Sequence, residues 1–138
     1  MAATPNQEIN DLISDLIAAW DRADAKAFAR QFQKDGTFTN IFGQTFEGQE
    51  EFERRHVDVF TGIFKGTKFE LELLKLKYVR PDVALADLET RVLGITKKLP
   101  PVFQVPLGAP LRTRLLLVLV RESDTWWIAG YHNVDLKS

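Results

Sequence analysis

Residues 111–136, LRTRLLLVLVRESDTWWIAGYHNVDL, decide the fold class. Two runs rich in β-branched and aromatic side chains, 111–122 and 125–136, flank the turn pair Ser123-Asp124, which is the pattern of a β-hairpin. Every residue from 115 to 120 is apolar, as in a strand that is covered on both faces. This run is far shorter than the roughly 20 residues that a membrane-spanning helix needs. We therefore expect a buried antiparallel strand pair in this part of the chain.

Two further strands are predicted upstream, at 67–79 and 83–95, on either side of a turn at residues 80–82. Within the first of them the apolar side chains change parity after Leu73, which is what one extra residue in a β-bulge produces. A bulge bends its own strand and the strands beside it. The predicted sheet is therefore curved.

Segment 97–110 lies between these two pairs of strands and holds four of the six prolines. Because proline lacks an N–H group and has a fixed φ, neither a regular strand ladder nor a helix fits this segment. We interpret it as an ordered extension of the hairpin or as a lid.

The N-terminal half shows helical periodicity instead. Thr4, Pro5 and Gln7 have the residue types and spacing of a helix start, and an apolar stripe then follows over residues 9–20. Another helix is predicted over 49–64, with His56 on its apolar stripe. Both helices therefore present one face to a core.

A short helix is predicted between these two, after Asp24, carrying Phe28 and Phe32. It is expected to end before a turn at Asp35-Gly36, where Gly36 would supply a positive φ. Residues 37–47 then predict a short strand pair that is interrupted at Gly43. Helices followed by a long antiparallel sheet define an α+β fold with the helices on one face of the sheet.

The composition narrows the class of protein. The chain has 138 residues, which suits one hydrophobic core, and we expect a single domain over 1–138. Its net charge is −1, with 18 basic and 19 acidic residues spread along the chain, so no nucleic-acid surface is predicted. The absence of Cys excludes disulfides, thiol catalysis and Cys-based metal sites. The N-terminus lacks a basic stretch followed by an apolar run, so we expect no secretory signal and a cytoplasmic location.

The order of these elements, together with WWIAGYHN at 126–133, resembles the SnoaL-like branch of the nuclear transport factor 2-like superfamily. Within it, the segments FTNIFG (38–43), Arg55-His56 and YHNVD (131–135) resemble the bacterial SgcJ/EcaC family. The resemblance covers nearly the whole chain and implies a cone-shaped, cystatin-like fold whose helices pack on the concave face of the sheet. It implies no single activity, because isomerases, cyclases, epoxide hydrolases, dehydratases and non-enzymatic binding or assembly domains share the fold.

Two histidines are the candidate acid–base residues. A two-residue turn at Ser123-Asp124 places His132 opposite Leu115 on an apolar face, whereas a three-residue turn places it opposite Leu116. An imidazole on that apolar face is either a buried hydrogen-bonding group or a proton shuttle. In the cone that the resemblance implies, His56 faces the same hollow. Two histidines without a third close ligand make no zinc site, so no metal is expected.

The strand at 83–95 carries Asp87, Glu89 and Arg91 on one face. If this face points into the cone, Glu89 and Arg91 become secondary catalytic groups. Arg91 would lower the pKa of the neighbouring carboxylate and burial would raise it, so a base that titrates near neutral pH is feasible. If the face points outward, these residues form a solvated row of ion pairs or a dimer contact. Epoxide hydrolases of the superfamily alternate acids and Arg on a strand. The order here, and His132 on the last strand, depart from that pattern.

Several other residues have a binding interpretation and a structural alternative. Asp35 belongs first of all to the Asp-Gly turn. Arg112 and Arg114 are candidates for binding an acidic ligand group, although the two-residue turn would place Arg112 opposite Asp135. Large aromatic residues that could bind a ligand, with packing in the core as the alternative, are Trp20, Phe38, Phe60 and Trp126.

These observations leave two functions open. The first is a small-molecule pocket protein, with isomerase, cyclase or dehydratase chemistry that transfers a proton within a small apolar metabolite and needs no cofactor. The second is a non-catalytic ligand-binding or accessory domain that acts as a homodimer. The dimer is expected because apolar side chains on both faces of the strand at 115–120 favour a partner over the outer face.

Overall fold

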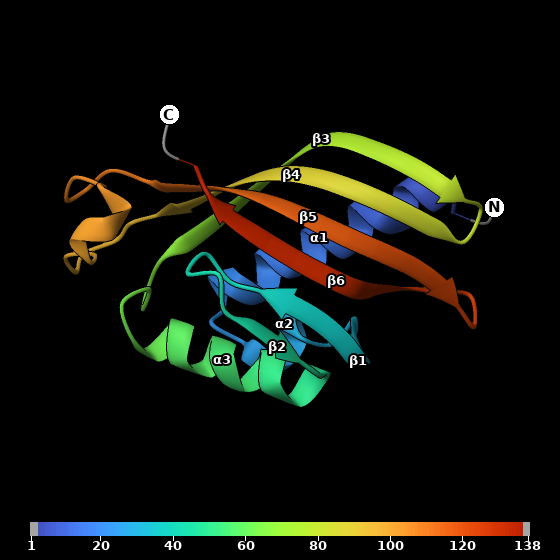
Figure 1. Cartoon of the computed structure of the whole chain (residues 1–138), viewed down its shortest axis with the longest axis horizontal. Helices are drawn as coiled ribbons and strands as arrows, with labels where there is room; N and C mark the ends of the chain where they lie inside the picture. The colour runs from blue at the N-terminus through green and yellow to red at the C-terminus, as the bar shows by residue number, and fades with distance from the viewer. Residues whose placement is uncertain (1–2, 137–138) are drawn as a thin grey trace.

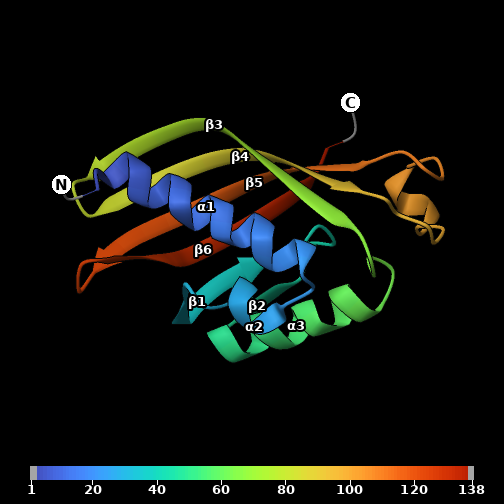
Figure 2. The same ribbon diagram turned by 180° about the vertical axis from the view of Figure 1, so that it is seen from behind.

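A single six-stranded sheet, in the order β2-β1-β6-β5-β4-β3, curves around three helices in the computed structural model, which describes residues 3–136 (Figure 1). The elements in chain order are α1 (Pro5–Asp21), α2 (Ala25–Phe28), β1 (Phe32–Thr39), β2 (Thr45–Glu47), α3 (Gln49–Thr61), β3 (Lys68–Arg80), β4 (Val83–Leu93), a 3-10 turn (Pro101–Phe103), β5 (Leu111–Glu122) and β6 (Thr125–Asp135). The view from behind shows α1 lying across the inner face of the sheet (Figure 2). The predicted α+β class, with helices on the concave face, is confirmed.

Helix α1 begins as the sequence predicts. The Thr4 hydroxyl accepts a hydrogen bond from the Gln7 backbone N–H, and the Gln7 side chain accepts one from the Thr4 backbone N–H. Its apolar stripe is buried against the sheet and ends at Trp20, whose ring stacks on Phe69 of β3 with centroids 4.3 Å apart. The indole N–H of Trp20 donates to the Thr67 hydroxyl, so this end of α1 is fixed to the start of β3.

The short helix α2 is capped by Asp24 as predicted, but Phe32 does not belong to it. Phe32 begins β1 and stacks on Phe52 of α3 with ring centroids 4.2 Å apart. The predicted turn at Asp35-Gly36 is also wrong, because both residues lie inside β1 and Gly36 has no positive φ. Gly36 is buried at an irregularity in the pairing of β1 with β6, and its missing side chain leaves room for the Phe32 ring.

Strand β1 pairs with β6 in parallel, while all other neighbouring strands are antiparallel. Phe38 lies opposite Tyr131, and Thr39 lies opposite His132. A parallel pair needs a long crossover, which the rest of the chain supplies. This pairing brings the β1–β2 hairpin and α3 beside β6.

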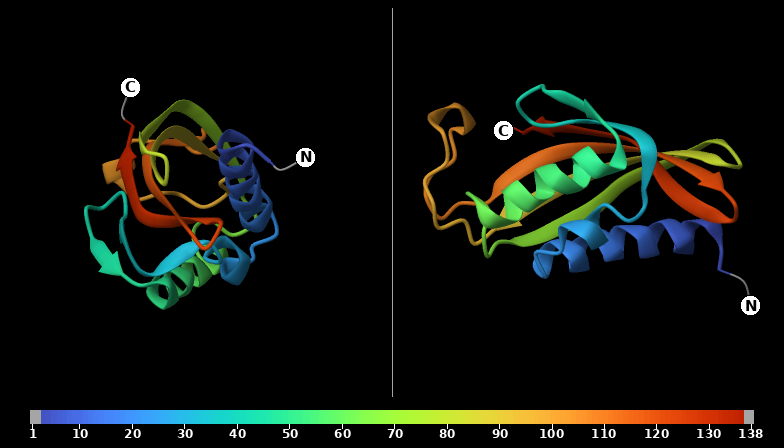
Figure 3. Two further views of the ribbon diagram at one scale, coloured as in Figure 1. Left: turned by 90° about the vertical axis from the view of Figure 1, so that its right-hand side faces the viewer. Right: turned by 90° about the horizontal axis from the view of Figure 1, so that it is seen from below.

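The register between neighbouring strands shifts at several points, and only the shift after Leu73 was predicted. The register of β3 shifts between Leu73 and Lys75, as expected from its apolar pattern. The register of β6 shifts as well, because Leu119 pairs with Ile128 and Val118 pairs with Gly130. One extra residue at this point moves every later side chain of β6 to the other face. The curl that results is visible end-on (Figure 3, left).

Segment 97–110 extends beyond the ends of β4 and β5, at the end of the molecule where the tip of the β1–β2 hairpin lies (Figure 3, right). Leu99 and Phe103 anchor it, since both are buried. Gly94 and Gly108, both at positive φ, stand close to its two ends. No helix in the described part of the chain is both long enough and apolar enough to cross a lipid bilayer.

Candidate functional site

A cavity of about 470 Å³ lies between the inner face of the sheet and α3. This volume falls within the range of small-molecule sites. Its walls are mostly apolar and come from the end of α1, the β1–β2 hairpin, α3 and strands β3 to β6. The polar side chains on these walls include His56, Tyr131, Asn133, Thr90 and Thr113.

His56 projects from the middle of α3 and is buried. Its Nδ1 lies 2.7 Å from the Phe52 carbonyl oxygen, which can only accept, so Nδ1 carries the proton and Nε2 keeps its lone pair. The ring packs against Phe28 and Phe52, with centroids 4.6 and 4.4 Å away, and these contacts fix its orientation. Burial lowers the pKa of His56 to about 4, against the opposing effect of its hydrogen bond to Phe52. The imidazole is therefore neutral at pH 7.

Tyr131 reaches the same cavity from β6 and is also buried. Burial raises the pKa of its phenol above the ordinary value, so the group stays protonated and can donate a hydrogen bond. No group among residues 3–136 forms a hydrogen bond with its hydroxyl in this structure. The ring centroids of Tyr131 and His56 lie 6.4 Å apart. A neutral base and a neutral acid thus face one hollow.

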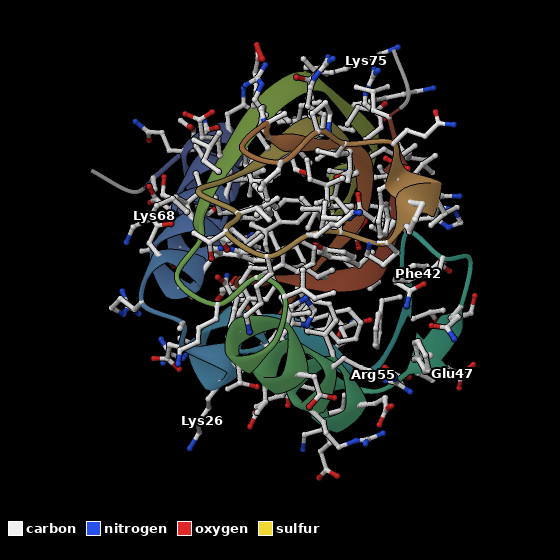
Figure 4. All side chains as sticks on the ribbon, turned by 90° about the vertical axis from the view of Figure 1, so that its left-hand side faces the viewer. Lys26, Phe42, Glu47, Arg55, Lys68 and Lys75 are labelled. Carbon is white, nitrogen blue, oxygen red and sulfur yellow. The ribbon has the colours of Figure 1, made fainter. Side chains whose placement is uncertain are left out.

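The rim of the cavity is built from the β1–β2 hairpin and α3 (Figure 4). The guanidinium of Arg55 stacks over the Phe46 ring at 3.9 Å and donates to Glu51 at 2.9 Å. Asn40 accepts from the backbone N–H groups of Phe42 and Gln44, which shapes the hairpin tip. Glu51 also accepts from Arg54 at 2.6 Å, so two guanidinium groups share one carboxylate at this rim.

The predicted position of His132 is wrong. The turn at Ser123-Asp124 has two residues, as expected, but the unpredicted bulge in β6 pairs His132 with Leu116 and turns its imidazole to the outer face. The side chain is exposed there and does not line the cavity. The same bulge brings Tyr131 and Asn133 to the inner face, where the sequence analysis had not placed them.

Of the two alternatives left open for Glu89 and Arg91, the outward one is correct, so neither residue is a candidate catalytic group of the cavity. The two side chains lie on the outer face of β4, where Arg91 approaches Glu89 to 2.6 Å and Arg112 approaches it to 3.1 Å. The hydrogen bond from Arg112 is the main reason why the pKa of Glu89 lies below its ordinary value. Arg112 lies opposite Arg91 and not opposite Asp135, since Asp135 pairs with Thr113.

The four aromatic candidates divide into two groups. Trp20 and Phe38 line the cavity. Phe60 and Trp126 do not, because Phe60 packs edge-on against Trp20 in the core and Trp126 lies near Tyr78. Within residues 3–136, no three His, Cys, Asp or Glu side chains gather closely enough to hold a metal ion.

A family model described as a SnoaL-like domain matches residues 9–133. A domain of unknown function with a cystatin-like fold, from Nostoc punctiforme, superposes with a TM-score of 0.83 at 22% identity, over 100% of this chain and 81% of that one. A protein from Novosphingobium aromaticivorans, provisionally assigned as a scytalone dehydratase, gives 0.77 at 14% identity, over 94% and 83% of the two chains.

A ketosteroid isomerase-like protein from Erwinia carotovora atroseptica superposes with a TM-score of 0.73 at 16% identity, over 96% of each chain. At these identities the solved structures show the fold alone. No functionally curated protein matches the sequence.

Proposed function

We propose, from the premise that this chain belongs to the SnoaL-like domain family, that it binds a small, largely apolar carbonyl compound and moves a proton within it without a cofactor. The observation that carries the proposal is that His56 and Tyr131 line one mostly apolar cavity, while neither Nε2 of His56 nor the phenol O–H of Tyr131 has a hydrogen-bond partner within residues 3–136. Similar structures include an isomerase-like protein and a provisional dehydratase, which supports proton-transfer chemistry. Placement of the chain in the SgcJ/EcaC family stays a prediction.

The two groups take complementary parts in the reaction. Nε2 of His56 accepts a proton from the carbon next to the ligand carbonyl, while Tyr131 donates a hydrogen bond to the carbonyl oxygen as it becomes an enolate. In an isomerisation the protonated His56 returns the same proton to another carbon of the ligand. In a dehydration it protonates a departing hydroxyl group, which leaves as water. Either route balances without an added reactant.

The low basicity of His56 is compatible with this role. A weak base suffices where the enolate is stabilised by a hydrogen bond in a site that excludes water. The protonated imidazole is then a strong acid, because burial disfavours its charge, and it readily gives the proton back. The protonated state of Tyr131, favoured by the same burial, keeps its O–H available.

Ligand access is proposed to occur at the end of the cavity near segment 97–110. Phe42 of the hairpin lines the cavity and contacts Phe103 of the segment, with ring centroids 5.1 Å apart. The Lys97 ammonium donates to the carbonyl of Gly62, just after α3, at 3.3 Å. Two such contacts and the flanking glycines suit a lid that opens without disturbing the sheet.

Deuterium exchange tests the proposal without knowledge of the natural product. The probe is 2-tetralone, a bicyclic ketone with acidic protons next to its carbonyl, incubated in D₂O and followed by NMR. The protein is expected to accelerate exchange over the solvent background, and His56→Phe and Tyr131→Phe to reduce that acceleration at least about 100-fold. His132→Asn, on the outer face, is the matched control and is expected to keep it. Acceleration that survives both cavity substitutions would refute the proposal.

A non-catalytic, dimeric accessory domain is the second candidate. Leu116, Val118 and Val120 stand in a row on the outer face of β5, each partly exposed. No helix covers this face in the described chain (Figure 1). A second copy of the chain is the proposed cover. Light scattering at micromolar concentration tests the dimer, and a monomer would contradict it; binding of 2-tetralone without exchange would favour the accessory function.

A further inference from the structure

Two buried threonines interrupt the apolar wall of the cavity. Thr90 of β4 and Thr113 of β5 lie directly opposite each other, and their hydroxyl groups share a hydrogen bond. Their exposed fractions are only 1% and 2%, yet both line the cavity. Their neighbours on the same face, Val92 and Leu111, are apolar and also line it. The pair is therefore a small polar patch on an otherwise apolar wall.

The shared hydrogen bond leaves this patch incompletely used. Each threonine hydroxyl carries one proton and two lone pairs, and the bond between them consumes one proton and one lone pair. Thr90 and Thr113 form no other side-chain hydrogen bond with residues 3–136. One hydroxyl proton and several lone pairs thus stay available. A ligand group that uses this spare capacity adds a hydrogen bond to the complex and stabilises it.

Asn133 adds a second polar group to the same wall. Asn133 belongs to β6 and lines the cavity. It lies opposite Leu115 of β5 and is therefore a diagonal neighbour of Thr113. Its Oδ1 is buried and has no hydrogen-bond partner within the described chain. The amide oxygen of this lining residue therefore has hydrogen-bonding capacity that the described chain does not use.

The two threonines lie at some distance along the cavity from His56 and Tyr131, the proposed acid–base pair. Tyr131 lies opposite Leu117, and Thr113 stands four residues earlier on β5, which corresponds to about 13 Å along a strand. Thr113 is near the start of β5, toward segment 97–110. A ligand whose carbonyl meets Tyr131 would thus present its opposite end to the threonines.

We propose that the ligand is a neutral, largely apolar carbonyl compound with a hydroxyl group at the end remote from the carbonyl, and that Thr90, Thr113 and Asn133 recognise this hydroxyl. The inference rests on the proposed function of the same cavity and adds the class of substrate. The ligand hydroxyl accepts the spare threonine proton and donates its own proton to a threonine or amide oxygen. A neutral ligand fits because the cavity walls are mostly apolar and the three recognising side chains carry no charge.

The test compares two fluorescent probes, 2,6-dihydroxynaphthalene and 2-naphthol, in equilibrium titrations. The wild-type protein is expected to bind the dihydroxy probe about tenfold more tightly. The double variant Thr90→Val/Thr113→Val, which keeps the side-chain shape, is expected to lose this preference while its affinity for 2-naphthol changes by less than about twofold. Thr113→Ser keeps the hydroxyl and is the matched control, expected to retain the preference.

The outcomes separate this inference from the proposed function. A wild-type protein that binds both probes equally, or a double variant that keeps the preference, would overturn the inference alone. His56→Phe and Tyr131→Phe are expected to lower the affinity for both probes to a similar extent. If they lower the affinity for neither probe, the proposed function is refuted, whatever the result for the threonine variants. Thermal unfolding of each variant shows whether its fold is retained, and Asn133→Ala gives a second, independent loss of preference if the double variant does not fold.

Discussion

The rings of His56 and Tyr131 face one cavity from opposite walls, with centroids 6.4 Å apart and planes inclined by 74°. His56 comes from α3 and Tyr131 from β6, two elements that are far apart in the sequence. Phe52 contacts both rings, so the helix and the strand are packed together at this point. The geometry of the pair is therefore part of the core and does not depend on a mobile loop.

The buried imidazole makes stability depend on pH. His56 has a pKa of about 4 in the folded state, against about 6.5 unfolded, so the unfolded chain binds the proton first as the pH falls. Above pH 6.5 the group contributes nothing to this dependence. Between pH 6.5 and 4 stability is lost, by about 2–3 kcal/mol, and below pH 4 the loss levels off.

Urea unfolding of the wild type and of His56→Phe at pH 7 and pH 4.5 measures this effect. The other acidic groups titrate in both proteins, so the difference between the two losses isolates His56. The wild type is expected to lose about 2 kcal/mol more than the variant. An equal drop in the free energy of unfolding in the two proteins would show that His56 takes up a proton in the folded state as easily as in the unfolded state.

Tyr131→Phe is expected to separate stability from binding. The Tyr131 side chain lines the cavity and its hydroxyl has no hydrogen-bond partner within residues 3–136, so its removal should change the free energy of unfolding by less than about 0.5 kcal/mol. The affinity for 2-naphthol should fall about tenfold. Chemical denaturation and fluorescence titration measure the two quantities. A large loss of stability with unchanged affinity would assign the hydroxyl a structural role.

Gly36→Ala is expected to destabilise the fold by about 1–3 kcal/mol. A Cβ at this position would lie 2.7 Å from Cε1 of Phe32 and 3.1 Å from the Ile128 carbonyl oxygen. The Phe32 ring cannot move aside easily because it stacks on Phe52. Asp35→Ala, on the exposed neighbouring residue, is the control and should change stability by less than about 0.5 kcal/mol in urea titrations. Equal effects of the two substitutions would contradict the packing described for β1.

Phe103→Ala is expected to speed ligand exchange. The substitution removes the ring contact with Phe42 that links segment 97–110 to the hairpin, while the walls around His56 stay in place. Stopped-flow mixing should show faster dissociation of 2-naphthol, by about threefold or more. Val102→Ala, on an exposed neighbour, is the control. Unchanged dissociation in Phe103→Ala would mean that the segment does not gate the cavity.

Local patterns predicted most of the elements correctly. The capping box at Thr4, the stripe that buries His56 and the bulge after Leu73 all depend on residues close together in the sequence, and the structure confirms each of them. The SnoaL-like resemblance is confirmed as well. The parallel pairing of β1 with β6 depends on contacts between distant segments, which no local pattern contains.

The position of His132 was wrong because one bulge was missed. Trp126 and Ile128 are buried at a spacing of two residues, whereas the next buried residue, Tyr131, follows after three. The same change of parity correctly predicted the bulge in β3, and a glycine inside a strand, here Gly130, is a further sign of irregularity. The signal was present but weak, because Ala129 and Gly130 have too little side chain to mark a face.

The tautomer of His56 tests the central claim most directly. A ¹H–¹⁵N correlation spectrum at pH 7, with His132→Asn removing the signals of the other histidine, reports the protonation of both ring nitrogens. We predict a proton on Nδ1 and none on Nε2, and a shift of the Nε2 resonance when bound 2-naphthol donates a hydrogen bond from its hydroxyl group to Nε2. A proton on Nε2 in the free protein, or an Nε2 resonance whose chemical shift stays unchanged when 2-naphthol binds, would contradict the account.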